Sequence, residues 1–219
     1  EAATAREERN YLDGRHPELV RYTDSLEYDM KRRDFTVNAL WYDPVSEEVC
    51  DCVGGVTDLE RGILRTVGTP EERFREDYLR MLRAVRFAAR LGLKPAPGTR
   101  RAISDLAPLA AELAPERIAG ELTRMLTGPA PDRAMRLLLE LGLLRAVLPE
   151  VAALDGVAQP PQFHPEGDVF THTMLMLHHM VYPDARLAWS VLLHDIAKPL
   201  TQMTDETGRI RFFGHECEG

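Results

Sequence analysis

The stretch Glu76–Gly92, EDYLRMLRAVRFAARLG, is the feature of the sequence that most constrains the fold. Its apolar residues recur three or four positions apart, at Leu82, Val85 and Ala89. This spacing is typical of a helix that packs one face against a core. The pair Thr69-Pro70, followed by two glutamates, is a typical helix start, and Gly92 is a typical helix end. The sequence therefore predicts one helix from Thr69 to Gly92.

Arginines also recur in this stretch, at Arg80, Arg83, Arg86 and Arg90, with Asp77 at their head. Local ion pairs explain part of the pattern, namely Asp77 with Arg80 and Glu76 with Arg80 or Arg83. Each such pair contributes about 0.2–0.5 kcal/mol. They explain Arg83 and Arg86 poorly, because no acidic residue lies three or four positions beyond either.

A functional interpretation accounts for all four residues Asp77, Arg80, Arg83 and Arg86. A carboxylate accepts hydrogen bonds and a guanidinium only donates them. Asp77 beside Arg80 therefore matches the amine and the adjacent ring acceptor on the edge of cytosine or adenine. The later arginines are then available to bind phosphates.

The rest of the chain divides into a first part with short predicted strands and a later part with predicted helices. Short strands are predicted in the first 68 residues, at 19–22, 47–53 and 63–68. Helices are predicted at 99–106 and 115–127, from Pro131 onward, at 169–181 and at 185–197, with a turn-rich boundary at 155–168. The helix after Pro131 carries an apolar stripe of Leu137, Leu138, Leu141 and Leu144. We predict an α+β fold that is predominantly α-helical.

Composition excludes some classes of protein and leaves others open. The net charge of −8 argues against a simple basic nucleic-acid binder, but not against a local positive groove. Lysine occurs only at Lys31, Lys94 and Lys198, so arginine dominates the basic residues. This excess suits phosphate and base contacts, and a genomic composition bias explains it equally well.

Three cysteines, Cys50, Cys52 and Cys217, do not make a disulfide framework. Cys50 and Cys52 alternate on a predicted strand, so we expect a pair on the core face rather than a metal site. No apolar run approaches a membrane span and no secretory signal opens the chain. The sequence thus predicts a cytoplasmic protein without a membrane partner, and it leaves the oligomeric state open.

Five motifs occur in order: YLDGRHPELV, RRDFTVNAL, DCVGGVTDLERGILRTVG, RFRED and EDYLRMLRAVRFAARLG. Together they resemble the class II tRNA nucleotidyltransferases, which include CCA-adding, CC-adding and A-adding enzymes and bacterial poly(A) polymerases. The resemblance covers about residues 1–92 and continues more loosely to 150. It implies the end of a nucleotidyltransferase head at 1–62, a helical neck at 63–130, a helical connection or body at 131–155 and a further domain at 156–219.

The resemblance also implies residue roles. Asp77 and Arg80 are expected to act as a protein template for the base of CTP or ATP, and Arg83 and Arg86 to line the nucleotide pocket. Arg33 is expected near the sugar and phosphates, with Asp34 ordering it. The segment 1–17 resembles the flexible loop of the family, whose usual TFR reads Thr4-Ala5-Arg6 here, and Glu1 stands at the position of a helper carboxylate.

Nucleotidyl transfer in this family needs a Gly-rich turn and an Asp-x-Asp pair that holds Mg²⁺. No equivalent is found in this sequence, so we expect both upstream of Glu1 in a longer protein. On this expectation the chain is a fragment that retains part of the nucleotide site without polymerising.

The end of the chain is rich in histidine, in HPEGDVFTHT at 164–173 and LLHDIAKP at 192–199. Imidazole and carboxylate groups are good ligands for divalent metals. The spacing of His172, His194 and Asp195, with Lys198 just after, resembles an HD phosphohydrolase domain, here a partial all-α one. The resemblance adds His215 as a further ligand or phosphate contact and places a last aspartate beyond Gly219. His178 and His179 are interpreted as surface or packing residues.

We therefore expect a tRNA nucleotidyltransferase that adds C and/or A from CTP and ATP, with tRNA as its partner. The loop match favours a CCA-adding or A-adding enzyme over a CC-adding one, because CC-adding members lack that loop. Three alternatives remain open: a poly(A) polymerase, an HD phosphohydrolase whose front part binds nucleotide or RNA, and a non-catalytic RNA-binding fragment.

Overall fold

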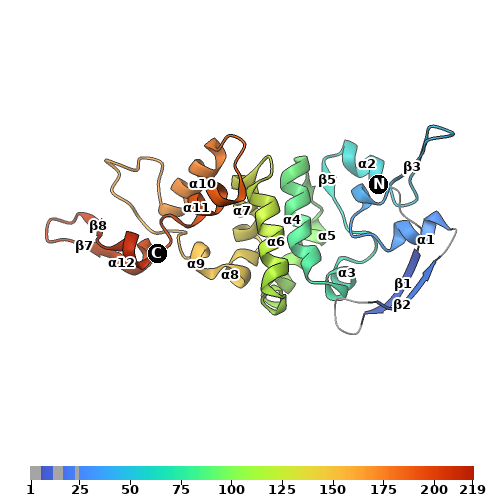
Figure 1. Cartoon of the computed structure of the whole chain (residues 1–219), viewed down its shortest axis with the longest axis horizontal. Coiled ribbons are helices and arrows are strands. Elements are labelled where there is room, and N and C mark those ends of the chain that lie inside the picture. The colour runs from blue at the N-terminus through green and yellow to red at the C-terminus, as the bar shows by residue number, and fades with distance from the viewer. Residues whose placement is uncertain (1–5, 12–16, 23–24) are drawn as a thin grey trace. The chain divides into compact units, whose positions relative to one another are not determined.

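A computed structural model describes residues 6–11, 17–22 and 25–219 of the chain (Figure 1). The chain forms two compact units, Glu1–Leu109 and Ala110–Gly219. The boundary falls inside the segment 63–130 that the sequence analysis treats as one helical neck. The division of the chain into four parts therefore stays a prediction, and each compact unit is taken by itself below.

The first unit combines two-stranded sheets with short and longer helices. Strands β1 (Arg6–Tyr11) and β2 (Pro17–Tyr22) pair antiparallel, as do β3 (Trp41–Asp43) and β4 (Glu48–Cys50), whereas β5 (Ile63–Leu64) and β6 (Lys94–Pro95) pair in parallel. The helices are α1 (Leu26–Lys31), η1 (Thr36–Asn38), α2 (Gly55–Glu60), α3 (Pro70–Glu76), α4 (Leu79–Leu91) and α5 (Pro97–Leu106), and η2 (Ala107–Glu112) crosses into the second unit. The predicted strands at 47–53 and 63–68 are thus shorter than expected.

The predicted single helix from Thr69 to Gly92 is wrong, because the chain breaks it at Asp77. This residue has an extended backbone, with φ −159° and ψ 108°. Its carboxylate accepts a hydrogen bond from the Leu79 N–H at 3.0 Å, and its carbonyl accepts one from the Arg80 N–H at 3.0 Å. Asp77 therefore satisfies backbone donors that the first turn of α4 leaves open. The predicted end is confirmed, with Gly92 in the left-handed region at φ 72°.

Helix α4 lies at the centre of the core of the first unit. The predicted apolar positions Leu82, Val85 and Ala89 are buried. The largest fully buried side chains of this unit include Phe35, Leu64 and Phe74, which come from other elements than α4. The contact of α3 with α5 completes this packing.

Asp51 organises the corner that leads into α2. Its two carboxylate oxygens accept hydrogen bonds from four consecutive backbone N–H groups, those of residues 53–56, at 2.8–3.0 Å. The helix then passes so close to η1 that a Cβ on Gly55 would lie 2.2 Å from the Thr36 carbonyl oxygen. Only glycine fits at position 55, and Asp51 fixes the turn that brings it there.

Asp51→Ala is expected to lower the free energy of unfolding by about 2 kcal/mol at pH 7, because four backbone donors lose their acceptor. Burial raises the pKa of Asp51, and the hydrogen bonds from residues 53–56 lower it by more, so the pKa lies below its usual value. Because the folded-state pKa is lowered, the stabilisation by Asp51 is fully present above the unfolded-state pKa of about 3.9. It is lost as the pH falls through the folded-state pKa. Urea unfolding at pH 7 and at acid pH measures the gap between wild type and variant. Glu60→Ala, at an exposed position on α2, is the control, and equal stabilities at pH 7 would contradict the prediction.

The regular elements of the second unit are mainly helices. Its elements are α6 (Pro115–Leu126), α7 (Pro131–Glu140), α8 (Leu143–Val147), α9 (Pro149–Ala152), α10 (Val169–His179), α11 (Ala185–Leu193), α12 (Lys198–Thr201) and α13 (His215–Glu218), with an antiparallel pair of β7 (Gln202–Thr204) and β8 (Ile210–Phe212). Helix α7 contacts α6, α8 and α10. In the predicted leucine stripe, Leu138, Leu141 and Leu144 are buried and Leu137 is half-buried.

Two predicted helices of this unit end earlier than expected. Helix α10 stops at His179, and α11 stops at Leu193, so His194 and Asp195 lie in the turn that follows it. Trp189 on α11 donates a hydrogen bond from Nε1 to Thr123 Oγ1 on α6 at 3.0 Å. This contact fixes α11, and with it the start of the turn that carries the two metal-ligand candidates.

The cysteines differ from the expectation. Cys50 packs against the cluster of Met30, Ala39 and Val67, but Cys52 is exposed. The predicted core-face pair is wrong because β4 ends at Cys50, so alternation does not extend to Cys52. Among the described helices, none combines the length and the apolar character needed to cross a membrane.

Candidate nucleotide and metal sites

Asp34 joins two of the arginines on α4. Its Oδ2 pairs with Arg83 Nε, and its Oδ1 lies 3.7 Å from Arg80 Nε. The side chain of Arg80 is only 9% exposed, so this pairing fixes it within the protein. Asp34 stands 49 positions before Arg83, which is why the sequence offered no local acidic partner for that arginine.

Glu76 holds Arg80 from the other side. Its Oε2 pairs with Arg80 Nη1 and, at 2.8 Å, with Arg73 Nη1. Arg80 Nη1 also donates to the Arg73 carbonyl at 3.0 Å, and Arg73 Nε donates to the Val67 carbonyl at 2.9 Å. The local pair of Glu76 with Arg80 is thus present, inside a larger network that fixes the direction of the Arg80 guanidinium.

Arg33 is ordered by a residue that the sequence analysis missed. Arg33 Nε and Nη2 donate to Asp29 Oδ2 at 3.1 and 3.0 Å, and Arg32 Nε donates to Asp29 Oδ1 at 2.9 Å. The expectation that Asp34 orders Arg33 is therefore wrong, because Asp34 pairs with Arg80 and Arg83. The signal was in the sequence, since Asp29 precedes the two arginines by three and four positions on a helix.

Burial raises the pKa of Asp29, and the hydrogen bonds from Arg32 and Arg33 lower it by more, so its pKa stays below the usual value. The carboxylate is fully buried and remains charged at neutral pH. The buried carboxylate of Asp29 thus holds Arg33 in place, while 34% of the Arg33 side chain stays exposed.

Aromatic rings support the remaining arginine. The Arg86 guanidinium lies over the Phe87 ring at 4.5 Å from its centroid, and Phe87 meets Phe35 edge-on at 5.7 Å. Phe35 is the neighbour of Asp34 in the chain, so the ring contacts and the ion pairs connect the same two segments. The first unit therefore brings together Asp34, Arg80 and Arg83, with Arg86 on the adjacent ring.

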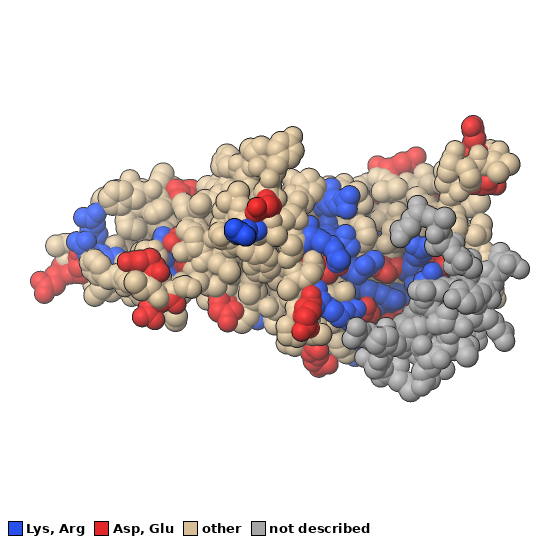
Figure 2. Space-filling model, viewed as in Figure 1, with Lys and Arg blue, Asp and Glu red and all other residues tan. Residues whose placement is uncertain are grey.

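The surface of the first unit carries a concentration of positive charge. Figure 2 shows lysine and arginine side chains gathered over the region of α3 and α4, while acidic side chains are scattered more widely. The chain as a whole carries a net charge of −8. The composition left open a local concentration of positive charge, and one is present on this face, where it suits an anionic ligand.

The second unit brings the predicted metal ligands together. One ligand atom each of His172, His194 and Asp195 lies within 4.8 Å of the others. His215 Nε2 lies 3.6 Å from Asp195 Oδ1. His178 and His179 are exposed on α10, with their rings stacked edge to face at 5.3 Å.

Asp195 is the buried charge of this cluster, with only 4% of its surface exposed. Its Oδ2 lies 3.0 Å from His194 Nε2 and 2.8 Å from Lys198 Nζ. Burial raises the pKa of Asp195, and His194 and Lys198 lower it by more, so its pKa lies well below the usual range. A buried, ionised carboxylate beside two histidines fits a cation site.

Lys198 is buried too, and Gln159 Oε1 accepts a hydrogen bond from its Nζ at 2.7 Å. The Lys198 Nζ also lies 5.2 Å from the centroid of the Phe212 ring. These contacts place a fixed positive charge beside Asp195. They suit the binding of an anionic group next to a cation.

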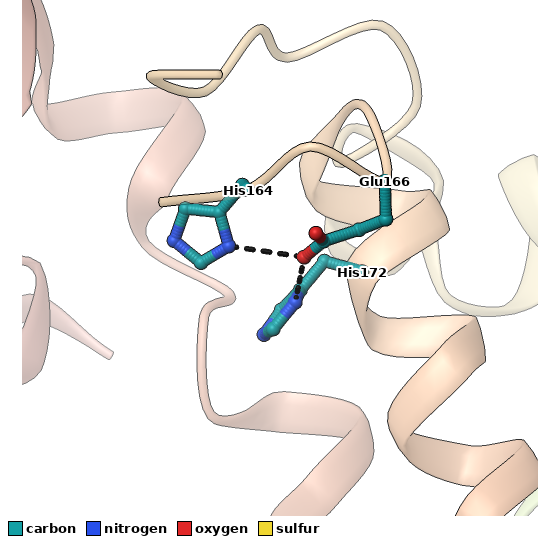
Figure 3. A group of neighbouring side chains, drawn as sticks. All are labelled: His164, Glu166 and His172. Atoms are coloured by element: carbon teal, nitrogen blue, oxygen red, sulfur yellow. Dashed lines mark hydrogen bonds and ion pairs between the residues drawn. The ribbon is translucent and has the colours of Figure 1, made fainter. Parts of the chain in front are cut away.

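A second histidine cluster lies at the start of α10, and the sequence analysis missed its central residue (Figure 3). Glu166 Oε1 lies 3.1 Å from His164 Nδ1 and 2.6 Å from His172 Nδ1. The backbone N–H of Glu166 itself, followed by the hydrogen bonds with His164 and His172, lowers the pKa of the Glu166 carboxyl to about 2. The motif HPEGDVFTHT contained the signal, because Glu166 stands between the two histidines.

Comparison with known proteins decides the family. Residues 1–65 match the family model of the poly A polymerase head domain, and residues 92–154 match the model of the probable RNA and SrmB-binding site of polymerase A. A CCA-adding enzyme of Geobacillus stearothermophilus is 47% identical over 152 residues, covering 69% of this chain and 37% of that enzyme. The chain belongs to the class II tRNA nucleotidyltransferase family.

Other members of the class II tRNA nucleotidyltransferase family agree with this assignment. A multifunctional CCA protein of Xanthomonas campestris is 43% identical over 185 residues, covering 81% of this chain and 44% of that protein. The crystal structure of a Bacillus stearothermophilus CCA-adding enzyme in complex with CTP superposes with a TM-score of 0.64 at 35% identity, covering 82% of this chain and 43% of that one. The chain thus spans less than half the length of the relatives that it matches.

As a class II tRNA nucleotidyltransferase, the chain has the predicted α+β, mainly helical fold. Glu1, the possible helper carboxylate, lies outside the described residues, as does most of the loop segment 1–17 apart from the backbone of β1. The roles of Arg33, Asp34, Asp77, Arg80, Arg83 and Arg86 in binding nucleotide stay predictions.

Proposed function

We propose that the full-length protein adds C and/or A to the 3′ end of tRNA from CTP and ATP, in tRNA maturation and repair in the cytoplasm. The reaction forms a phosphodiester bond between the RNA 3′-hydroxyl and the α-phosphate and releases pyrophosphate. The observation that carries the proposal is the fixed arginine pair of α4, in which Arg80 and Arg83 share Asp34. The relatives named CCA-adding enzyme and the structure in complex with CTP support it.

In this proposal each candidate nucleotide-binding side chain of the first unit contacts a different part of the nucleotide. The Asp77 carboxylate accepts from the exocyclic amine of cytosine or adenine, and the Arg80 guanidinium donates to the adjacent ring nitrogen. Arg83 and Arg86 line the pocket, and Arg33 contacts the sugar or phosphates.

The acidic partners supply preorganisation. Because Asp34, Glu76 and Asp29 already hold the arginines, little freedom is lost when a nucleotide binds.

Members of the family use a divalent cation, for which we propose Mg²⁺. The acidic partners of the arginines in the first unit do not fit such a site, since Asp29, Asp34 and Glu76 are each engaged by arginines. We therefore assign them to ordering the arginines. Ligation of Mg²⁺ by a residue pair upstream of Glu1 stays a prediction.

A tailing assay with the full-length protein tests the tRNA function. A tRNA transcript without its CCA end is expected to gain one, two or three nucleotides from CTP and ATP and then stop. A generic RNA of equal length is the control and is expected to stay nearly unextended. Equal, long A-tails on both RNAs would instead support the poly(A) polymerase alternative, to which the matched head-domain model also corresponds.

A second candidate function belongs to the second unit, where we propose a metal-dependent phosphohydrolase of the HD type. The observation that favours it is the approach of His172, His194 and the buried Asp195 to one another. A divalent cation held there would supply an activated water for attack on a phosphate ester. Lys198 and His215 would then bind the phosphate or orient Asp195.

A further inference from the structure

Glu166 contacts two histidines through one oxygen. Its Oε1 lies 2.6 Å from His172 Nδ1 and 3.1 Å from His164 Nδ1 (Figure 3). The loop that carries Glu166 is fixed where it enters α10, because Asp168 accepts hydrogen bonds from the N–H groups of Thr171 and Gly156, both at 2.7 Å. Glu166 is therefore held at the first turn of the helix that carries His172.

These distances determine which nitrogen of His172 carries the proton. An ionised carboxylate only accepts hydrogen bonds, so His172 Nδ1 must donate. In a neutral imidazole the other nitrogen, Nε2, then has a free lone pair. His172 also belongs to the group formed with His194 and Asp195, so Nε2 is the nitrogen available to a cation in that group.

The other two histidines of the site are oriented in the same manner. His194 Nδ1 lies 2.8 Å from the Val191 carbonyl oxygen, and His215 Nδ1 lies 2.7 Å from the Phe212 carbonyl oxygen. A carbonyl oxygen only accepts, so both Nδ1 atoms donate, and both Nε2 atoms face Asp195 at 3.0 and 3.6 Å. Among these three histidines, His172 Nδ1 donates to a charged side chain, whereas the Nδ1 atoms of the other two donate to backbone carbonyls.

The short distance argues against a cation between Glu166 and His172. Two ligands of one cation, each about 2.0–2.2 Å from it, lie about 3 Å or more apart. The 2.6 Å between Oε1 and Nδ1 is instead that of a charge-assisted hydrogen bond. The cluster of His164, Glu166 and His172 thus orients a ligand rather than forming a cation site of its own.

We propose that Glu166 is a positioning residue of the second unit, which fixes the Nδ1–H tautomer of His172 and so presents Nε2 to a divalent cation bound with His194 and Asp195. This inference rests on the proposed metal-binding function of that unit. A carboxylate behind a metal-bound histidine both orients the ring and strengthens the ligand, and its loss costs about 10–100-fold in metal affinity.

The test uses Mn²⁺ alone as the probe and measures its affinity for the chain by electron paramagnetic resonance. Glu166→Ala is expected to weaken Mn²⁺ binding by about 10–100-fold, and Glu166→Gln, which keeps an acceptor oxygen, is expected to lose less. His164→Ala is expected to leave the His172 tautomer unchanged, because Glu166 remains. Glu206→Ala, at an exposed position in the turn between β7 and β8, is the matched control.

A second readout needs no metal. Nitrogen-15 correlation spectra of the imidazoles in the metal-free chain are expected to show the Nδ1–H form of His172 in wild type and a mixture of both forms in Glu166→Ala. Backbone amide spectra check that each variant folds. Unchanged affinity together with an unchanged His172 tautomer in Glu166→Ala would overturn the inference while leaving the metal site intact. Absence of Mn²⁺ binding by wild type would overturn the metal-binding function and the inference with it.

Discussion

Arg80→Ala in the full-length protein is expected to lower kcat/KM for CTP and ATP by about 10²–10³-fold and to reduce the preference for them over GTP and UTP. Arg80 is buried, and Asp34, Glu76 and the Arg73 carbonyl all fix its guanidinium. A fixed, desolvated donor contributes about 3–4 kcal/mol to transition-state binding, which corresponds to this range. Loss of a donor that matches one base edge also weakens discrimination between bases.

Single-nucleotide addition to a tRNA transcript, with each of the four nucleotides in separate reactions, measures both effects of Arg80→Ala. Arg90→Ala is the matched control, because Arg90 lies on the same helix but is exposed. It is expected to leave the ratio between nucleotides unchanged. A lowered rate with unchanged selectivity in Arg80→Ala would refute the template role and leave Arg80 as a structural residue. Asp77→Ala tests the acceptor side of the same template.

Asp195→Ala is expected to weaken Mn²⁺ binding by the second unit by more than about 10²-fold, since even outer partners of a metal site are worth about 10–100-fold. Metal-dependent release of phosphate from 2′,3′-cyclic or 2′-phosphorylated nucleotides should disappear with it. The variant also leaves the charge of Lys198 buried without its acidic neighbour, which destabilises the fold by about 3–5 kcal/mol.

Asp195→Asn separates ligation from stability. It keeps the shape of the side chain and an oxygen toward Lys198, but it removes the negative charge that a cation requires. Thermal unfolding reports the fold, and metal titration reports the site. Retained Mn²⁺ affinity in a folded Asp195→Asn protein would exclude Asp195 as a ligand, and retained phosphate release would assign that activity to another part of the protein.

Helix positions were accessible from sequence because their signals are local. The glycine at 92 ends α4 as predicted, and the predicted helices at 99–106 and 115–127 correspond to α5 and α6. The break at Asp77 was missed, since its carboxylate satisfies the start of a new helix inside a segment whose periodicity continues without interruption. Periodicity shows which face is buried, but it does not show where one helix stops and the next one starts.

The site residues also divide into those with a local sequence signal and those without one. The adjacent pair of His194 and Asp195 was visible in the sequence, the resemblance to an HD domain added His172, and the structure brings these three together. The acidic partner of Arg83 could not be predicted from the sequence, because Asp34 comes close to Arg83 only after the chain has folded. Glu166 was overlooked for a different reason. A carboxylate that acts by orienting a histidine has no spacing rule of its own.

The shared carboxylate of Asp34 limits how the first unit can respond to different nucleotides. One side chain holds both Arg80 and Arg83, and Glu76 holds Arg80 from the opposite side. Rotating the Arg80 side chain to a new rotamer would therefore break its ion pairs with both Asp34 and Glu76. If Arg80 contacts the base as proposed, we therefore expect a change between cytosine and adenine to move α4 and the Asp34 segment together rather than Arg80 alone. The edge-on contact of Phe35 with Phe87 joins the same two segments, so a substitution there is expected to alter nucleotide choice through them.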